Sequence, residues 1–168
     1  MVTSRPTRRR HRLAPVTIWA FDATADELNA MSSGSLVAAL GIEVTEITER
    51  SVRGRMPVDS RTTQPAGVLH GGASVALAET LASWAGYLAV DRTRFHVVGQ
   101  EINANHIRPV SPGSWVHAEV TPAAIGRRSH VWEVRITNDE GKLVCISRCT
   151  LAVIEMASSY TSEDRRGR

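Results

Sequence analysis

The feature that most constrains this chain is the run from Gly72 to Leu88, which reads GASVALAETLASWAGYL. It has no proline, is rich in alanine, and places apolar residues on every side of a helical wheel, which predicts a helix buried all round. Glu79 is its only charged residue. A buried carboxylate is costly unless it is paired, so Glu79 is a candidate base or nucleophile, and an ion pair with an arginine is the structural alternative.

Strand patterns flank this helix. Alternating apolar and polar residues over 42–58 predict a two-stranded hairpin that turns near Glu49 and Arg50. Short helices are expected over 22–31 and 34–41. Four further strands are expected over 95–108, 114–126, 129–138 and 142–155, and since no long helix interrupts them, an antiparallel meander is favoured.

These elements predict an α+β fold in which a curved antiparallel sheet wraps the long helix. A single curved sheet leaves an edge strand exposed, and such an edge favours pairing with a second copy into one continuous sheet. A homodimer is therefore expected from topology alone.

The length of 168 residues fits one domain, which we expect over 18–156. A flexible basic arm over 1–17 carries five arginines, and a disordered tail follows over 157–168. Such an arm could contact nucleic acid, but a solvated terminus is the simpler interpretation, and nucleic acid is not an expected partner. No apolar run is long enough to span a membrane and no convincing secretory signal is seen, so we expect a cytoplasmic protein.

The two cysteines, Cys145 and Cys149, lie four residues apart in a strand pattern. Their Cα atoms are then about 13 Å apart, which is too far for a disulfide. We expect both to be buried and reduced.

The loop before the long helix carries candidate polar groups. Gly71 and Gly72 leave the first helical N–H groups accessible, and such groups bind anions or a developing oxyanion, although the glycines could serve only a tight turn. Gln64 and His70 lie just upstream, where a backbone-bonded loop histidine is the ordinary alternative. Ser83 is one turn after Glu79 and could hydrogen-bond it or simply pack.

Helix geometry limits how these groups can cooperate. Glu79 is eight residues beyond Gly71, which places it roughly 12 Å along the helix. The two can act on one atom only if Glu79 comes from a second subunit whose helix runs antiparallel beside the first. A two-fold axis then creates two equivalent sites.

The parts of this site suit acyl transfer to water. Amide donors polarise a carbonyl, and a carboxylate attacks it or activates water. The sequence has no serine-hydrolase elbow, metal-ligand spacing, phosphate-binding loop or dinucleotide fingerprint, so we expect neither a metal nor a cofactor. A carboxylate is a modest catalyst for an amide, whereas a thioester is more electrophilic and has a good leaving group.

Three stretches carry a specific family resemblance: MPVDSRTTQPAGVLHGGASVALAETLASWAGYLA, VVGQEINANHIRP and GRRSHVWEVRITNDEGKLVCISRCTLAVIE. Together they resemble the hotdog-fold acyl-CoA thioesterases, and within them the bacterial 1,4-dihydroxy-2-naphthoyl-CoA and related aryl-CoA hydrolases. The resemblance covers about residues 19–156. It implies a hotdog fold, a dimer or a tetramer built as a dimer of dimers, and an acyl-CoA substrate.

The resemblance also implies roles for individual residues. Glu79 matches the catalytic nucleophile or general base, and Gly71 the amide that polarises the thioester carbonyl. Gln64 and His70 match the pair that orients substrate or water from the opposite subunit, and Ser83 the supporting hydroxyl. Substrate-binding positions are matched by Gly72, His106, Arg108 and Arg128, with the choice between Arg127 and Arg128 left open.

Several alternatives remain at this point. Aromatic acyl groups are the first expectation, followed by medium-chain acyl-CoA or acyl carrier protein thioesters. A hydratase or dehydratase of the same fold is less favoured, because those enzymes place the histidine differently and lack this Gln-Pro entry to His-Gly-Gly. A non-catalytic acyl-CoA-binding regulator is also less favoured, since pure binding does not need Glu79 and the arm is too short for a helix-turn-helix.

Overall fold

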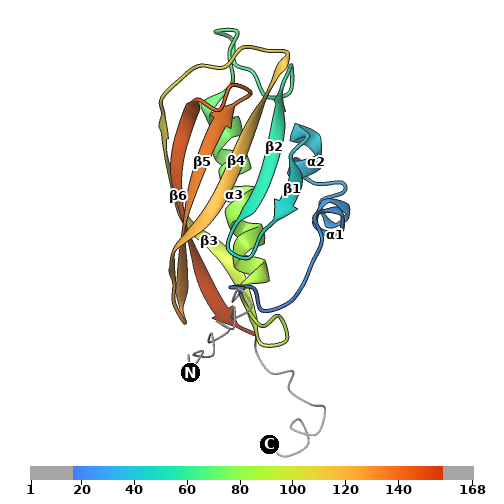
Figure 1. Ribbon diagram of the computed structural model, residues 1–168, viewed down its shortest axis with the longest axis vertical. Helices are drawn as coiled ribbons and strands as arrows, with labels where there is room; N and C mark the ends of the chain where they lie inside the picture. Colours follow the sequence, from blue (N-terminus) through green and yellow to red (C-terminus); the bar gives the residue numbers. More distant parts are fainter. Residues whose placement is uncertain (1–16, 157–168) are drawn as a thin grey trace, which may run out of the picture.

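The computed structural model describes residues 17–156, in which a long helix lies against one face of a single curved sheet (Figure 1). The predicted arm and tail therefore lie largely outside the described residues. The elements, in chain order, are α1 (Ala25–Met31), α2 (Leu36–Leu40), β1 (Glu43–Ile47), β2 (Val52–Val58), α3 (Gly71–Leu88), β3 (Phe95–His106), β4 (Ser114–Ile125), β5 (Ser129–Asn138) and β6 (Leu143–Glu155).

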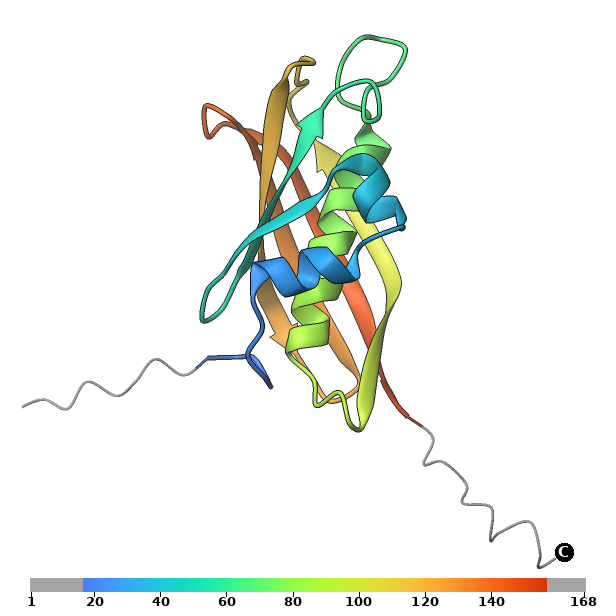
Figure 2. The ribbon, with the colours of Figure 1, turned by 90° about the vertical axis from the view of Figure 1, so that its right-hand side faces the viewer.

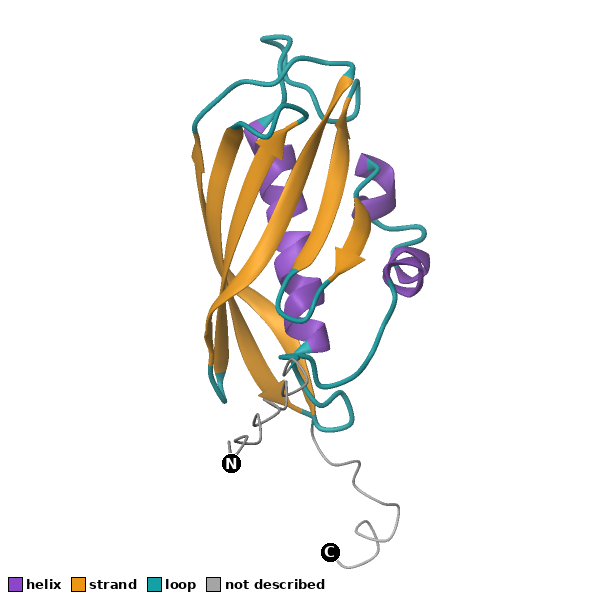
Figure 3. Cartoon of the chain, in the orientation of Figure 1, coloured by secondary structure: helices purple, strands orange, loops and turns teal. Residues whose placement is uncertain are grey.

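Helix α3 runs along the sheet, α2 contacts α3, and α1 lies against the edge strand β1 (Figures 2 and 3). This arrangement confirms the predicted α+β fold, a long helix wrapped by an antiparallel sheet. Helix α1 begins with a capping box, in which Thr24 accepts from the Glu27 N–H and the Glu27 carboxylate accepts from the Thr24 N–H. No helix among residues 17–156 combines the length and apolar character needed to cross a bilayer.

The six strands follow the order β1-β2-β4-β5-β6-β3, and every neighbouring pair is antiparallel. Strands β4, β5 and β6 form the expected meander. The expectation that β3 belongs to the same meander is wrong, because β3 pairs with β6 at the far edge of the sheet. The reason is that α3 crosses the face of the sheet between β2 and β3 and delivers the chain to the opposite edge.

The side of α3 that faces the sheet forms the centre of the core. Leu77, Leu81 and Ala85 are fully buried there, and they pack in one cluster with Trp132 and sheet residues. The other side of the helix is not covered. The prediction of a helix buried all round is wrong for the single chain, since Glu79 is exposed, because one sheet can cover only one side of a helix.

The closest approach between α3 and the sheet occurs at Gly86. A Cβ added there would lie 2.3 Å from Cδ1 of Leu151, which is itself fully buried. Alanine is a better helix former than glycine by about 1 kcal/mol, but forcing a methyl group into a filled core costs about 1–3 kcal/mol.

We expect Gly86→Ala to lower the free energy of unfolding by about 1–2 kcal/mol in urea denaturation, because the overlap outweighs the gain in helix propensity. Leu151→Val shortens the opposing side chain. In the double variant it should recover part of the loss. Strictly additive effects of the two substitutions would show that they do not meet.

The two edges of the sheet differ in how they are protected. At the β1 edge, the Asn29 side chain of α1 accepts from the Val44 N–H at 2.8 Å and donates to its carbonyl at 2.9 Å, so it imitates a neighbouring strand. The edge of the twelve-residue strand β3 has no such cover among the described residues. Unprotected edges favour pairing with another chain.

A bulge in β3 decides which of its side chains face α3. The pairing register with β6 shifts between Gly99 and Glu101. Before the bulge Val97 packs toward the helix, and after it Ile102 and Ala104 do so. The bulge therefore turns residues of opposite parity to the same face.

Candidate active site

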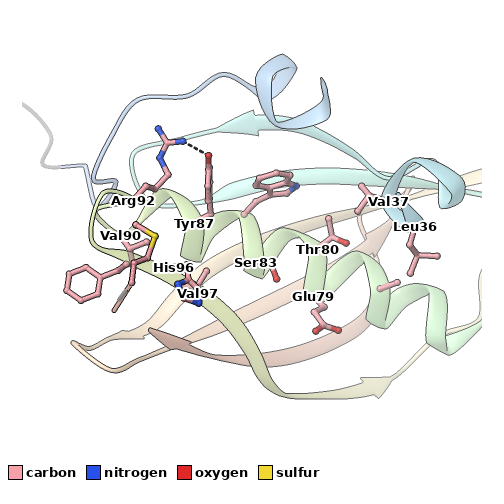
Figure 4. A pocket seen from close by; sticks show the side chains of 14 residues that line it. Leu36, Val37, Glu79, Thr80, Ser83, Tyr87, Val90, Arg92, His96 and Val97 are labelled. Atoms are coloured by element: carbon pink, nitrogen blue, oxygen red, sulfur yellow. Dashed lines mark hydrogen bonds between the residues drawn. The ribbon is translucent and has the colours of Figure 1, made fainter. Parts of the chain in front are cut away.

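An open groove of about 580 Å³ runs along the uncovered side of α3 (Figure 4). Glu79 and Ser83, one turn apart on the helix, both line it. Most of the remaining lining is apolar or aromatic and includes Leu36, Ala76, Trp84, Tyr87, Phe95 and Val97. The groove is therefore suited to an apolar group that must be held beside a carboxylate.

The carboxylate of Glu79 lies against the backbone of β3. A Cβ added at Gly99 would be 2.9 Å from its Oε1 atom, so the glycine makes room for it. None of the ion pairs within residues 17–156 includes Glu79, and no arginine of the described chain holds it as a structural pair.

Cys145 and Cys149 are buried and free, as predicted. Burial, together with the nearby charges of Glu79 and Glu101, raises the pKa of the Cys149 thiol to about 11. Burial also raises the pKa of Cys145. Both cysteines are thus protonated and inert near neutral pH.

The start of α3 offers one free amide donor. His70 is the N-cap, and its Nδ1 accepts from the Gly72 N–H at 2.8 Å. A neutral imidazole whose Nδ1 accepts carries its hydrogen on Nε2. The N–H of Gly71 has no hydrogen-bond partner among residues 17–156. Gly71, rather than Gly72, is therefore the amide that can donate to a ligand.

A second cavity of about 300 Å³ opens beside this helix start. Gln64, Gly71, His106 and Arg108 all line it. His106 packs directly over the glycine, because a Cβ added at Gly71 would lie 2.8 Å from its Nε2. Gln64 Nε2 donates to the carbonyl of Leu69 at 3.3 Å. The Arg108 guanidinium donates to the carbonyl of Leu143, the first residue of β6.

Arg128 lies in neither of these places. With Arg127 it lines a third cavity, of about 760 Å³, near the C-terminal end of α3. His130 lines the same cavity and is 2% exposed, and its Nδ1 has no hydrogen-bond partner among the described residues. Burial lowers the pKa of His130, and a hydrogen bond with the Gly126 backbone offsets part of this.

One chain therefore separates the predicted site residues into three groups. Glu79 and Ser83 line the groove, Gln64 and Gly71 line the cavity at the helix start, and Arg128 lies at the other end of the helix. This separation fits the helix-length argument that a single copy cannot bring Glu79 to Gly71.

The sequence analysis missed the aromatic and cationic part of the groove. Trp84, Tyr87 and Arg92 line it, yet none was singled out. Tyr87 continues the spacing of four residues that joins Glu79 to Ser83, and this signal could have placed it on the same side of α3. Arg92 lies in the loop after the helix, where no periodicity indicates its direction.

Comparison with known proteins gives consistent matches. The family model described as the thioesterase superfamily matches residues 66–145. The 1,4-dihydroxy-2-naphthoyl-CoA hydrolase of Escherichia coli (strain K12) is 45% identical over 137 residues, covering 82% of this chain and 99% of that protein. The proofreading thioesterase EntH of Cronobacter turicensis is 49% identical over 137 residues, covering 82% and 98%.

The fold comparison agrees. The crystal structure of a mutant of thioesterase PA1618 from Pseudomonas aeruginosa matches with a TM-score of 0.81 at 44% sequence identity. The match covers 83% of this chain and 100% of that one.

Proposed function

Because this chain belongs to the thioesterase superfamily and is a thioester hydrolase, we propose that it hydrolyses acyl-CoA thioesters at a site shared between two copies. The observation that carries the proposal is that one chain places the candidate carboxylate and the candidate amide donor in two different cavities. Glu79 lines an open groove, whereas the backbone amide of Gly71, unpaired within the described chain, opens into a separate cavity.

The unprotected edge of β3 supplies a way to join these two cavities. Glu79 lies against Gly99, and Gly71 lies against His106, so each cavity is attached to a known position on β3. If two β3 strands pair antiparallel with Asn103 opposite Asn103 of the second copy, the bulge between Gly99 and Glu101 places Gly99 opposite His106. Paired residues on neighbouring strands are about 4.5–5.5 Å apart, so this register brings Glu79 to the Gly71 amide of the other copy.

In this assembly the Gly71 N–H donates to the thioester carbonyl oxygen and stabilises the negative charge that develops on it. Glu79 either attacks the carbonyl carbon, forming an anhydride and expelling the CoA thiolate, or removes a proton from a water that attacks instead. In the first route a water then hydrolyses the anhydride, which restores the Glu79 carboxylate, releases the acid and supplies the proton that the thiolate takes up. Gln64 and His70 orient substrate or water, His70 through the hydrogen on Nε2, and Ser83 supports Glu79. Both routes give the free acid and CoA thiol.

The charged part of CoA fits the remaining groups. An antiparallel pair of β3 strands places the far end of one copy, with Arg128, beside the helix start of the other, where His106 and Arg108 lie. Guanidinium groups suit phosphates because they donate in a planar fork. The pair can therefore supply cations from both chains to one nucleotide.

We infer that the acyl group is aromatic, such as a dihydroxynaphthoyl or benzoyl group. The support is the aromatic lining of the groove by Trp84, Tyr87 and Phe95, together with the similarity to a naphthoyl-CoA hydrolase. Thiol release from a panel of aromatic and medium-chain acyl-CoA thioesters tests this directly. A preference for the medium-chain members would favour the rival substrate class, and no thiol release from any member would contradict the proposed function.

The two roles of His70 can be separated. We expect His70→Ala to lower the free energy of unfolding by about 1 kcal/mol, because the cap of α3 is lost, and to slow hydrolysis as well. Asparagine is a good N-cap residue but has no imidazole. His70→Asn should therefore restore the unfolding free energy and leave hydrolysis slow, and recovery of both would show that His70 only caps the helix.

A further inference from the structure

The groove that holds Glu79 has a guanidinium at its other end. Arg92 lines the same cavity and lies beside Tyr87 (Figure 4). It donates a hydrogen bond to the Tyr87 hydroxyl. Its Cζ atom lies 3.6 Å from the ring centroid of Phe21 and 4.9 Å from that of Tyr87. Two aromatic rings therefore fix the direction of the guanidinium.

No carboxylate of the described chain neutralises this charge. None of the ion pairs within residues 17–156 includes Arg92. The adjacent Asp91 carboxylate accepts from the N–H and hydroxyl of Thr93 instead. Arg94, two residues further on, is paired with Glu155 at 3.6 Å. Since a guanidinium has five N–H donors, Arg92 keeps unused donors at the edge of a mostly apolar groove.

The spacing of residues along α3 indicates how long an acyl group must be to contact both Glu79 and Arg92 in the groove. Glu79 and Tyr87 are eight residues apart, or about 12 Å along the helix axis. If the acyl group makes a contact of about 3 Å at each end of this distance, the acyl group itself must be roughly 6 Å long. One aromatic ring with a substituent opposite the thioester spans this length.

We propose that Arg92 is a specificity residue that donates hydrogen bonds to an oxygen, phenolic or carboxylate, at the end of the acyl group far from the thioester. The proposal rests on the proposed function, because it takes Glu79 as the end where the thioester carbonyl lies. It adds a polar contact to a pocket whose lining is mostly apolar. Acyl groups without this oxygen offer no acceptor to the Arg92 donors that Tyr87 leaves unused.

The test compares two substrates that differ by one hydroxyl group, 4-hydroxybenzoyl-CoA and benzoyl-CoA. The ratio of their kcat/KM values is measured for the unmodified protein, Arg92→Gln, Arg92→Lys and the matched control Arg94→Gln. We expect a ratio of about 10 for the unmodified protein, as for a charge-assisted hydrogen bond weakened by exposure. The ratio should fall to about 1 in Arg92→Gln, be intermediate in Arg92→Lys, and stay unchanged in Arg94→Gln.

A binding measurement separates this proposal from the proposed function. Calorimetry with the non-hydrolysable ketone analogues of the two thioesters gives the same ratio without turnover. A ratio near 1 in the unmodified protein, or one unaffected by Arg92→Gln, would overturn the role of Arg92 whether or not hydrolysis occurs. Absence of hydrolysis with a binding ratio that depends on Arg92 would overturn the proposed function and leave the specificity assignment standing.

Discussion

Glu79→Gln is expected to reduce kcat for acyl-CoA hydrolysis by about 1,000-fold or more. The amide is nearly the same size as the carboxylate but can neither attack a carbonyl nor accept a proton from water, and a single acid–base group contributes about 10²–10⁴ to a rate. Because Glu79 is exposed and forms no ion pair in the described chain, stability should change little. Thiol release and urea denaturation measure the two effects.

The matched control is Glu133→Gln, which removes the same charge from the sheet. Glu133 is 48% exposed at its side chain and lies 3.9 Å from Arg135, so its loss should affect neither rate nor stability appreciably. A Glu79→Gln protein with kcat within a few-fold of the unmodified protein would eliminate Glu79 as nucleophile or base. Family membership would not be affected by that result.

Mixing two inactive variants is expected to restore activity. One variant carries Glu79→Gln and the other carries both Gln64→Ala and His70→Asn. In a mixed dimer one site receives all the substitutions and the other receives none. After unfolding and refolding together, about half of the dimers are mixed and each has one intact site, so about a quarter of the unmodified activity should return.

In the control for this experiment, the two variants carry substitutions at residues that line the same groove, so that one chain must supply both native residues to a site. Glu79→Gln mixed with Ser83→Leu, which fills the same groove, should give no recovery, because no site then receives both native residues. Sedimentation of the mixtures must also show a dimer or a larger assembly. Lack of recovery in the first mixture, or a monomer that hydrolyses thioesters at full rate, would disprove the shared site.

Much of the site was predicted from local sequence patterns. The long helix, its glycine entry and the unusual carboxylate are visible because helical periodicity and turn chemistry depend on neighbouring residues. Helix geometry likewise places Glu79 about 12 Å from Gly71 whatever surrounds the two residues. The reduced state of Cys145 and Cys149 likewise followed from their spacing on a strand.

Other features depended on contacts between distant segments. The pairing of β3 with β6, rather than with β4, leaves β3 at an unprotected edge. Its bulge turns Gly99 toward Glu79 and His106 toward Gly71. Neither the pairing of β3 with β6 nor the bulge follows from the alternation of residues in β3, since an alternating pattern does not identify the partner strand or reveal an inserted residue.

Local residues suffice to place a lone carboxylate on a long helix, eight residues beyond a glycine-rich start, because helix formation depends on residues within a few turns of one another. Long-range packing leaves one side of that helix uncovered by the sheet, so that Glu79 faces an open groove ending at Arg92. Which side of a helix stays exposed is decided by the area of the sheet that packs on it.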